Sequence, residues 1–320
     1  MNGRLLQISI IAVLLMLGAG FAVPGGAAEA QLQAPIAILL SDSEEAYTKP
    51  VATFSGEVGM PVKVFDLKGE VDNAAVLMGE ILAIKPALIF ALGAKAAYTA
   101  KVWTADTPEI PVLFAMVLNW ERYGLLDGQE NMAGIASEVD PGTQLINLTV
   151  ALPDVKRVGL VYSKAHSAET VAHVKREAAR LGLEIVEAPI NRPKEFRHTY
   201  KQIADKIDGF WMLADPVVYT LENVAWLEER CSRDHIVCIG PSRNIAEMGI
   251  LLAVNADVSN IGIQAASIAK SILLRDITPR QIGVMPPLGT RLVLNAKTAD
   301  RIGIEFNRTA LDMASDVIDK

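Results

Sequence analysis

Residues 209–240 read GFWMLADPVVYTLENVAWLEERCSRDHIVCIG, and this order predicts a strand, a turn, a helix and a second strand. The first apolar run ends at Asp215 and Pro216, and proline is tolerated in the first turn of a helix. Apolar residues then recur at helical spacing as far as Leu227, and a second apolar run ends at Gly240. Two buried strands joined by a helix form a βαβ unit, in which ligands bind at the carboxyl ends of the strands.

The same arrangement occurs earlier in the chain, over residues 87–116. One apolar run ends at Gly93, a helical stretch follows, and a second apolar run ends at Met116. The two copies share few identical residues, so what is repeated is the architecture. Two similar halves, each with its own sheet, predict a cleft between them. Strands alternate with helices along the rest of the chain, which indicates an α/β fold with parallel sheets.

Length and composition agree with a globular protein of two domains. The chain has 320 residues, of which 51% are hydrophobic and 21% are charged, so it can bury a substantial core. Its net charge is −7 and it contains no block of Lys or Arg. We therefore expect no nucleic-acid partner, and we expect a monomer.

The first 30 residues have the features of an export signal. Arg4 supplies a positive charge, residues 5–17 are almost wholly apolar, and Ala28, Glu29 and Ala30 form an A-x-A cleavage site. The apolar stretch is shorter than the ~20 residues that a membrane-spanning helix needs, which favours a cleaved signal over an anchor. We expect cleavage near Ala30 and a mature protein in the periplasm.

The residues that usually mark enzymes and metal sites are missing from the sequence. It has no G-x-S-x-G nucleophile elbow, no glycine-rich dinucleotide or phosphate motif, and no set of His and Cys at metal-binding spacing. We therefore expect no catalytic residue, no metal and no cofactor. The two cysteines, Cys231 and Cys238, could form a disulfide in an exported protein or remain as buried thiols, and the sequence leaves both possibilities open.

Several segments, in their order along the chain, resemble a known family. Besides the export signal, they are residues 157–162, 209–240, 247–254 and 294–305. With these segments the sequence is similar to the periplasmic substrate-binding proteins of ABC transporters with the type I fold. It is closest to the branch related to tryptophan- and tyrosine-binding components. The resemblance covers nearly all of the chain after the signal, and none of the segments is a catalytic signature.

The resemblance implies two Rossmann-like lobes with parallel sheets, joined by a hinge of three crossing segments and closing on a small molecule. We place the crossings near residues 137–138, 255–256 and 285–286. The N-terminal lobe would then hold residues 31–137 and 257–285, and the C-terminal lobe residues 138–256 and 286–320.

The resemblance also implies a partner, an ABC permease in the inner membrane, to which the protein would deliver its ligand. A sensor or adaptor with the same fold would instead present its closed form to a signalling receptor in the membrane. Both functions use closure of the same cleft, so the sequence alone does not separate them.

The candidate ligand-binding residues lie where strands end at the presumed cleft and helices begin. Free N–H groups at such helix starts suit a carboxylate or another anion. In the N-terminal lobe the candidates are Ser41, Asp42, Ser43, Gly93, Ala94, Ala115 and Met116. In the C-terminal lobe they are Ser163, Ala165, Asp215, Pro216 and Ser242.

Asp215 is the residue that we expect to matter most. The amino-acid binders of the family need one acid to meet an ammonium group, and Asp215 follows a predicted strand at the cleft. Its alternative role is to cap the N–H groups of Val217 and Val218, and the two roles can coexist. Three aromatic residues, Tyr47, Trp120 and Tyr219, could line an apolar pocket, although a place in the core is favoured for each. Because residues 93–96 and 114–118 are largely apolar, the ligand could be an amino acid or another small organic anion.

Overall fold

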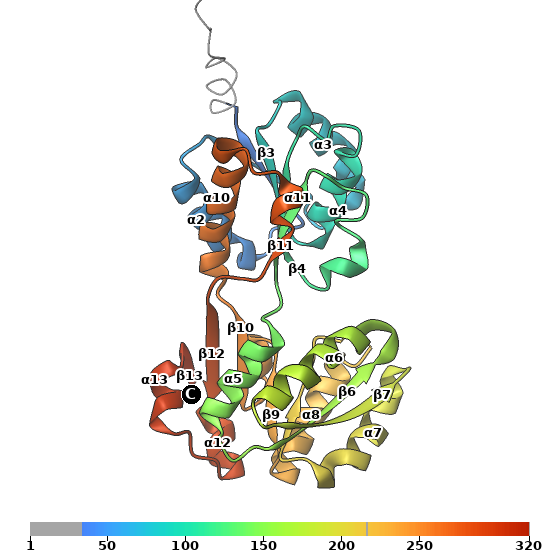
Figure 1. Cartoon of the computed structure of the whole chain (residues 1–320), viewed down its shortest axis with the longest axis vertical. Coiled ribbons are helices and arrows are strands. Elements are labelled where there is room, and N and C mark those ends of the chain that lie inside the picture. The colour runs from blue at the N-terminus through green and yellow to red at the C-terminus, as the bar shows by residue number, and fades with distance from the viewer. Residues whose placement is uncertain (1–33, 216, 320) are drawn as a thin grey trace, which may run out of the picture.

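The computed structural model describes residues 34–215 and 217–319. It has two lobes, one above the other in Figure 1, and each has helices on both faces of a mostly parallel sheet. The expected α/β fold with two Rossmann-like lobes is therefore confirmed. The predicted export signal lies outside the described residues. Within them, no helix is both long enough and apolar enough to cross a membrane.

The sheet of the first lobe has six strands, all parallel. From edge to edge they are β11 (Val284–Met285), β5 (Met132–Ala136), β4 (Val112–Val117), β3 (Leu88–Leu92), β1 (Ile36–Leu40) and β2 (Val62–Asp66). The helices of this lobe are α2 (Glu45–Val58), α3 (Ala74–Ala83), α4 (Ala94–Trp103), α10 (Val258–Arg275) and α11 (Pro279–Ile282), with short 3₁₀ turns η1 (Val71–Asn73) and η2 (Trp120–Tyr123).

Strand β1 shows how this sheet is buried on both faces. Successive side chains of a strand point to opposite faces. Ile36 and Ile38 pack into the core that includes α2 and α10, whereas Ala37 and Leu39 pack into the core that includes α3 and α4. All four side chains are fully buried, which explains why the strand is an unbroken apolar run in the sequence.

The sheet of the second lobe has seven strands, and its one antiparallel pair joins β10 and β12. In order they are β13 (Asp316–Ile318), β12 (Thr290–Asn295), β10 (Leu252–Ala256), β9 (Val237–Gly240), β8 (Gly209–Trp211), β6 (Arg157–Ser163) and β7 (Glu184–Ile190). The helices are α5 (Pro141–Ala151), α6 (Lys164–Arg180), α7 (Phe196–Ile203), α8 (Leu221–Asp234), α9 (Arg243–Glu247), α12 (Ala296–Ile302) and α13 (Arg308–Met313), with 3₁₀ turns η3 (Pro193–Glu195) and η4 (Ala204–Lys206).

The expected βαβ unit is present, but its helix begins later than predicted. The sequence predicted a helix directly after Asp215 and Pro216, whereas α8 begins at Leu221. Thr220 is its N-cap, because its side chain accepts a hydrogen bond from the amide of Asn223. Asp215 instead accepts from the amides of Val217 and Val218 in a turn that precedes the helix.

Three segments of the chain join the two lobes. The chain passes between the lobes three times: from β5 to α5, from β10 to α10, and from β11 to β12. We call these segments the first, second and third crossing, and we propose that the lobe boundaries lie within them.

Cys231, in α8, and Cys238, in β9, form a disulfide, which decides between the two possibilities left open by the sequence.

Candidate functional site

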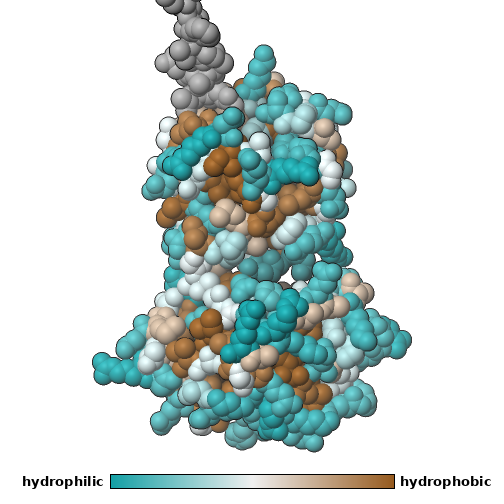
Figure 2. All heavy atoms as spheres, in the orientation of Figure 1, coloured by the Kyte–Doolittle hydropathy of each residue, from teal (hydrophilic) through white to brown (hydrophobic). Residues whose placement is uncertain are grey.

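A cavity of about 560 Å³ lies between the two lobes, beside the crossings. Figure 2 shows that the molecular surface is hollowed between the lobes. We call this space the hinge cavity. Its lining residues come from the β4–η2 loop of the first lobe, from the first and third crossings, from the end of β10 that leads into the second crossing, and from α5, α6 and the ends of β8 and β9 in the second lobe. A molecule bound there would contact both lobes and the segments that join them.

The β4–η2 loop has an unusual backbone. The pairing of β4 with β5 is irregular between Phe114 and Val117, as at a β-bulge. Met116 and Asn119 have φ angles of 58° and 48°, a left-handed conformation that is uncommon for residues other than glycine. Such conformations cost free energy and persist where the surrounding structure holds them. Here they turn the loop so that Asn119 and Trp120 line the hinge cavity.

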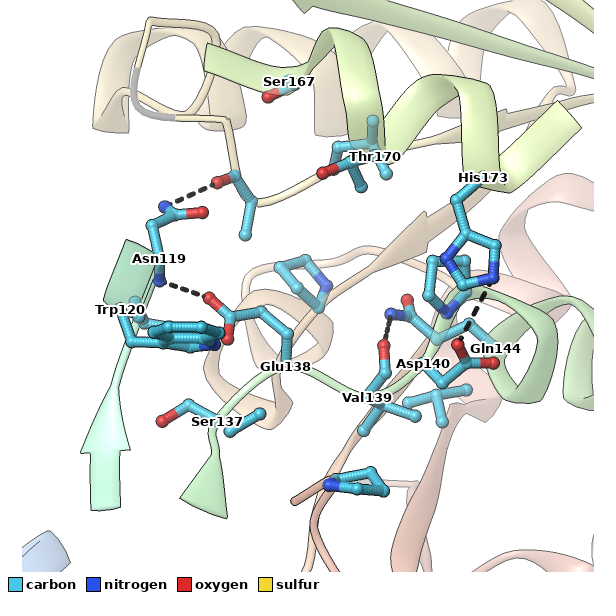
Figure 3. Close-up of a pocket in the computed structure, with 18 of the residues that line it drawn as sticks. Asn119, Trp120, Ser137, Glu138, Val139, Asp140, Gln144, Ser167, Thr170 and His173 are labelled. Atoms are coloured by element: carbon cyan, nitrogen blue, oxygen red, sulfur yellow. Dashed lines mark hydrogen bonds and ion pairs between the residues drawn. The ribbon is translucent and has the colours of Figure 1, made fainter. Parts of the chain in front are cut away.

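Asn119 contacts both the first crossing and the second lobe. Its backbone N–H donates to Oε1 of Glu138 over 2.5 Å, and its side-chain Nδ2 donates to the carbonyl of Ala214 over 3.4 Å (Figure 3). Burial raises the pKa of the Glu138 carboxyl above its usual range, and the Asn119 N–H only partly offsets this effect. One polar chain, Glu138–Asn119–Ala214, therefore joins the lobes across the cavity.

Polar contacts also fix the second-lobe side of the cavity. Asp140 caps α5 by accepting hydrogen bonds from the amides of Gly142 and Thr143, and its carboxylate lies 3.7 Å from Nε2 of His173. Gln144 donates to the carbonyl of Val139 over 2.8 Å and accepts from the indole N–H of Trp211 over 3.2 Å. The first crossing is thus tied to α5, α6 and β8.

The ionisable residues of the hinge cavity are mostly acidic. Its acidic members are Glu121, Glu138, Asp140 and Glu169, and its basic members are His173 and Arg176. The carboxylates favour a cationic group on a ligand, and Arg176 could pair with an anionic group. The described residues contain no group of three or more side chains placed to hold a metal ion.

The predicted residues of the first lobe gather at the ends of β1, β3 and β4. Ser41 is buried, and its Oγ accepts from the amide of Ala96 over 3.0 Å. Gly93 has a φ of 86°, and a Cβ there would clash with Tyr47 and Ser41. Their neighbours are placed as follows: Asp42 caps the amide of Glu44, Ser43 donates to Asp66, Ala94 begins α4, Ala115 is fully buried and Met116 is partly exposed.

Among the predicted residues of the second lobe, Asp215 is fully buried. One of its carboxylate oxygens accepts from the Ser163 amide and the Ser167 hydroxyl, and the other from the amides of Val217 and Val218. The capping role is therefore present in the structure, and the ammonium-binding role stays a prediction. The others are placed as follows: Ser163 is buried, Ala165 is exposed on the first turn of α6, Ser242 is the N-cap residue of α9, and Pro216 lies outside the described residues.

Of the predicted residues that the structure describes, none lines the hinge cavity. The residues that line it and were not predicted to bind ligand include Asn119, Glu138 and Arg176. One signal did exist in the sequence, because residues near each predicted crossing, Ser137 and Glu138 among them, line the cavity. Of the three aromatic residues, Trp120 lines the cavity and is partly exposed, against the favoured place in the core, whereas Tyr47 is a core residue and Tyr219 packs against a core.

The sequence and the fold both match known proteins. Residues 62–318 match the model of a family described as ABC transporter substrate binding protein. A ligand-free, open structure of a substrate-binding protein with adhesive properties from Clostridium difficile has a TM-score of 0.73 and 20% identity, and the match covers 89% of this chain and 99% of that one. No match was found among curated proteins.

Two further solved structures share the fold. One is the ABC domain in complex with L-Trp from Streptococcus pneumonia, with a TM-score of 0.60 and 18% identity, covering 89% of this chain and 100% of that chain. The other is a conserved domain protein from Vibrio cholerae, with a TM-score of 0.60 and 19% identity, covering 89% and 99%. At these identities the likeness establishes the fold that the chains share.

Proposed function

The chain belongs to the family of ABC transporter substrate-binding proteins, and on this premise we propose that it is an exported binding protein for a small organic ligand, either an amino acid or a related carboxylate. It would deliver that ligand to an ABC permease in the inner membrane. The observation that carries the proposal is the hinge cavity, because its walls come from both lobes and from segments that join them. The family is a solute-binding, non-catalytic class, which agrees with the lack of catalytic motifs in the sequence.

The size and charges of the hinge cavity support a small ligand with groups of both signs. Its volume of about 560 Å³ falls in the ~300–1,000 Å³ range that is usual for small-molecule sites. Acidic residues and Arg176 line the same space, so an ammonium and a carboxylate could each find a partner. The relative from Streptococcus pneumonia contains L-Trp, which supports amino acids as the first ligands to test.

Closure of the lobes would be the conformational change by which the permease detects a bound ligand. A ligand that contacts both lobes stabilises the closed arrangement over the open one by the difference in its affinity for the two. Closure would also bring the strand ends of the lobes toward each other, and we propose the strand-end residues, such as Ser41, Gly93 and Ser242, as contacts in that closed form. The permease would recognise the closed form.

Native mass spectrometry of the purified mature protein, followed by a thermal-shift screen of amino acids and small organic acids, tests the ligand class. We expect a co-purified small mass, or a rise in melting temperature with one group of compounds. A screen in which no amino acid or organic acid binds would overturn the ligand class.

Two further measurements test delivery and export. Deletion of the gene should reduce cellular uptake of the compound that binds, and unchanged uptake despite binding would favour a sensor over an importer. N-terminal sequencing of the periplasmic protein should find Gln31 first, and a mature protein that still begins at Met1 would refute cleavage near Ala30.

A further inference from the structure

We propose that Glu138, in the first crossing, binds a cationic amine group of the ligand in the hinge cavity. The inference rests on the proposed function, because it assumes that the cavity is the ligand site. It also names a part of the ligand that the proposed function leaves open, since a related carboxylate need not carry an amine. Glu138 lines the cavity at the point where the chain leaves the first lobe and enters the second.

Glu138 is an acid without a basic partner. Its carboxylate oxygen Oε1 accepts one hydrogen bond from the backbone N–H of Asn119, over 2.5 Å. Among the described residues no basic side chain forms an ion pair with it. A carboxylate that is largely removed from water is costly unless a cation or several hydrogen bonds compensate its charge. An ammonium group in the cavity would supply that missing cation.

The other acids near the site are either committed elsewhere or exposed. Asp140 caps α5 and lies beside His173. Asp215 is saturated by four donors and does not line the cavity. Glu121 and Glu169 line the cavity but are exposed to solvent, where water screens their charges. Glu138 is therefore the carboxylate best placed to bind a cation from the cavity.

The neighbours of Glu138 favour an amine, and one of them, Asn119, connects Glu138 to the second lobe. Trp120 follows Asn119 directly and lines the same cavity, and the face of an indole ring attracts cations (Figure 3). The Asn119 that donates to Glu138 also donates to Ala214 of the second lobe. An amine bound at Glu138 would thus sit at one end of the polar chain that joins the lobes.

Matched probes separate the amine from the carboxylate. Each set contains an amino acid, the amine that lacks its carboxylate, and the acid that lacks its amine. The sets are L-tryptophan, tryptamine and indole-3-propionate; L-phenylalanine, phenethylamine and 3-phenylpropionate; and L-leucine, isoamylamine and 4-methylpentanoate. Isothermal titration of the wild-type protein should give the weakest binding with the acids that lack an amine.

The Glu138→Gln variant tests the residue itself. Glutamine keeps an oxygen that can accept from Asn119 and removes the charge, so we expect binding of amine-containing probes to weaken by about 10- to 100-fold. Probes without an amine should bind both proteins alike. Glu80→Gln makes the same change on an exposed position of α3 outside the cavity, and it should leave every affinity unchanged.

The outcomes distinguish the two proposals. If wild type binds the acids that lack an amine as tightly as the amino acids, or if Glu138→Gln binds amines as wild type does, the assignment of Glu138 is overturned and the proposed function stands. If wild type binds no probe of any set and no amino acid or organic acid of the thermal-shift screen, the proposed ligand class fails and the assignment fails with it. The probe comparison on wild type needs no variant, so it decides even if Glu138→Gln does not fold.

Discussion

The two lobes have the same architecture but are stabilised differently. In the first lobe, α2 and α10 pack so closely that a Cβ at Gly262 would lie 2.4 Å from the carbonyl oxygen of Pro50. In the second lobe, a Cβ at Gly159 would meet a methyl group of Ile207, which can rotate. The second lobe contains the disulfide and nearly all ion pairs of the described residues, whereas Arg280 with Glu130 is the pair in the first. The same architecture is therefore stabilised by close backbone contact between two helices in the first lobe, and by a disulfide and ion pairs in the second.

The ion pairs contribute less to this difference than their number suggests. Several join exposed side chains four residues apart on a helix, such as Arg233 with Glu229 and Arg243 with Glu247. Exposed pairs of this kind contribute about 0–1 kcal/mol each and are screened by salt. The backbone contact, the disulfide and the buried Asp215 are thus the features whose removal should distinguish the lobes.

Gly262→Ala should have the largest effect, and it should act on the first lobe. The new Cβ would meet the carbonyl of Pro50 and the amide nitrogen of Phe54, and backbone atoms cannot rotate away. The helices must separate, which should lower the free energy of unfolding by about 3 kcal/mol. Urea unfolding measures the loss, and hydrogen exchange should locate it in α2 and α10.

Gly56→Ala is the matched control for this change. Gly56 lies in α2, and a Cβ there would have no neighbour within 4 Å. Alanine is the better helix former, so this variant should be neutral or more stable by up to about 1 kcal/mol. Equal stability of the two variants would contradict the view that the contact between α2 and α10 limits the first lobe.

Removing the disulfide should affect the second lobe only. Cys231 and Cys238 are separated by seven positions, and closing so short a loop stabilises the folded state by about 2.5 kcal/mol in the chain-entropy description. The Cys231→Ala, Cys238→Ala protein, or wild type in reductant, should show faster hydrogen exchange in α8 and β9. Faster exchange in α2 and α10 as well would show that the lobes do not unfold independently.

Asp215→Asn should destabilise the second lobe by about 2 kcal/mol, because an NH₂ group would replace one oxygen that accepts two hydrogen bonds. Thermal unfolding checks this value against Asp205→Asn, which changes an exposed acid of the same lobe and should have no effect. A variant that keeps its stability and loses ligand affinity would instead establish the ammonium-binding role predicted from the sequence.

The smallest effect concerns the first crossing, which belongs to neither sheet. Burial raises the pKa of Glu138, so the folded protein binds this proton more tightly than the unfolded chain does. The contribution of Glu138 to the free energy of unfolding should therefore grow as the pH falls from the raised pKa toward the usual range of glutamate. Affinity for an amine should change in the opposite direction, because the amine needs the ionised carboxylate.

Urea unfolding and titration calorimetry across this pH interval, with Glu138→Gln as reference, check both signs. The reference is needed because other ionisable side chains line the same cavity, namely Glu121, Asp140, Glu169, His173 and Arg176. Identical pH profiles for wild type and Glu138→Gln would refute both expectations.

Much of the fold could be predicted because the spacing of apolar residues along the chain indicates which side chains are buried. The apolar runs of β1, β3 and β9 can be buried only in a sheet covered on both faces, and the helical spacing between them requires a parallel connection. The predicted start of α8 was wrong because the side chain of Asp215 accepts hydrogen bonds from the following amides in a turn, and Thr220 then caps the helix. Local sequence does not decide between two competing caps.

The sequence by itself determined the class of the fold and its two-lobed repetition, since both follow from the order and periodicity of apolar segments. It also indicated the family, through the resemblance of several segments to known members. Only the tertiary structure decided which acid faces the space between the lobes. Asp215 is enclosed by donors from β6 and α6, and Glu138 is brought to the hinge cavity opposite Asn119 by the first crossing. The physical reason is that a carboxylate's role depends on its donors and its exposure to water, and these come from residues far away in the chain.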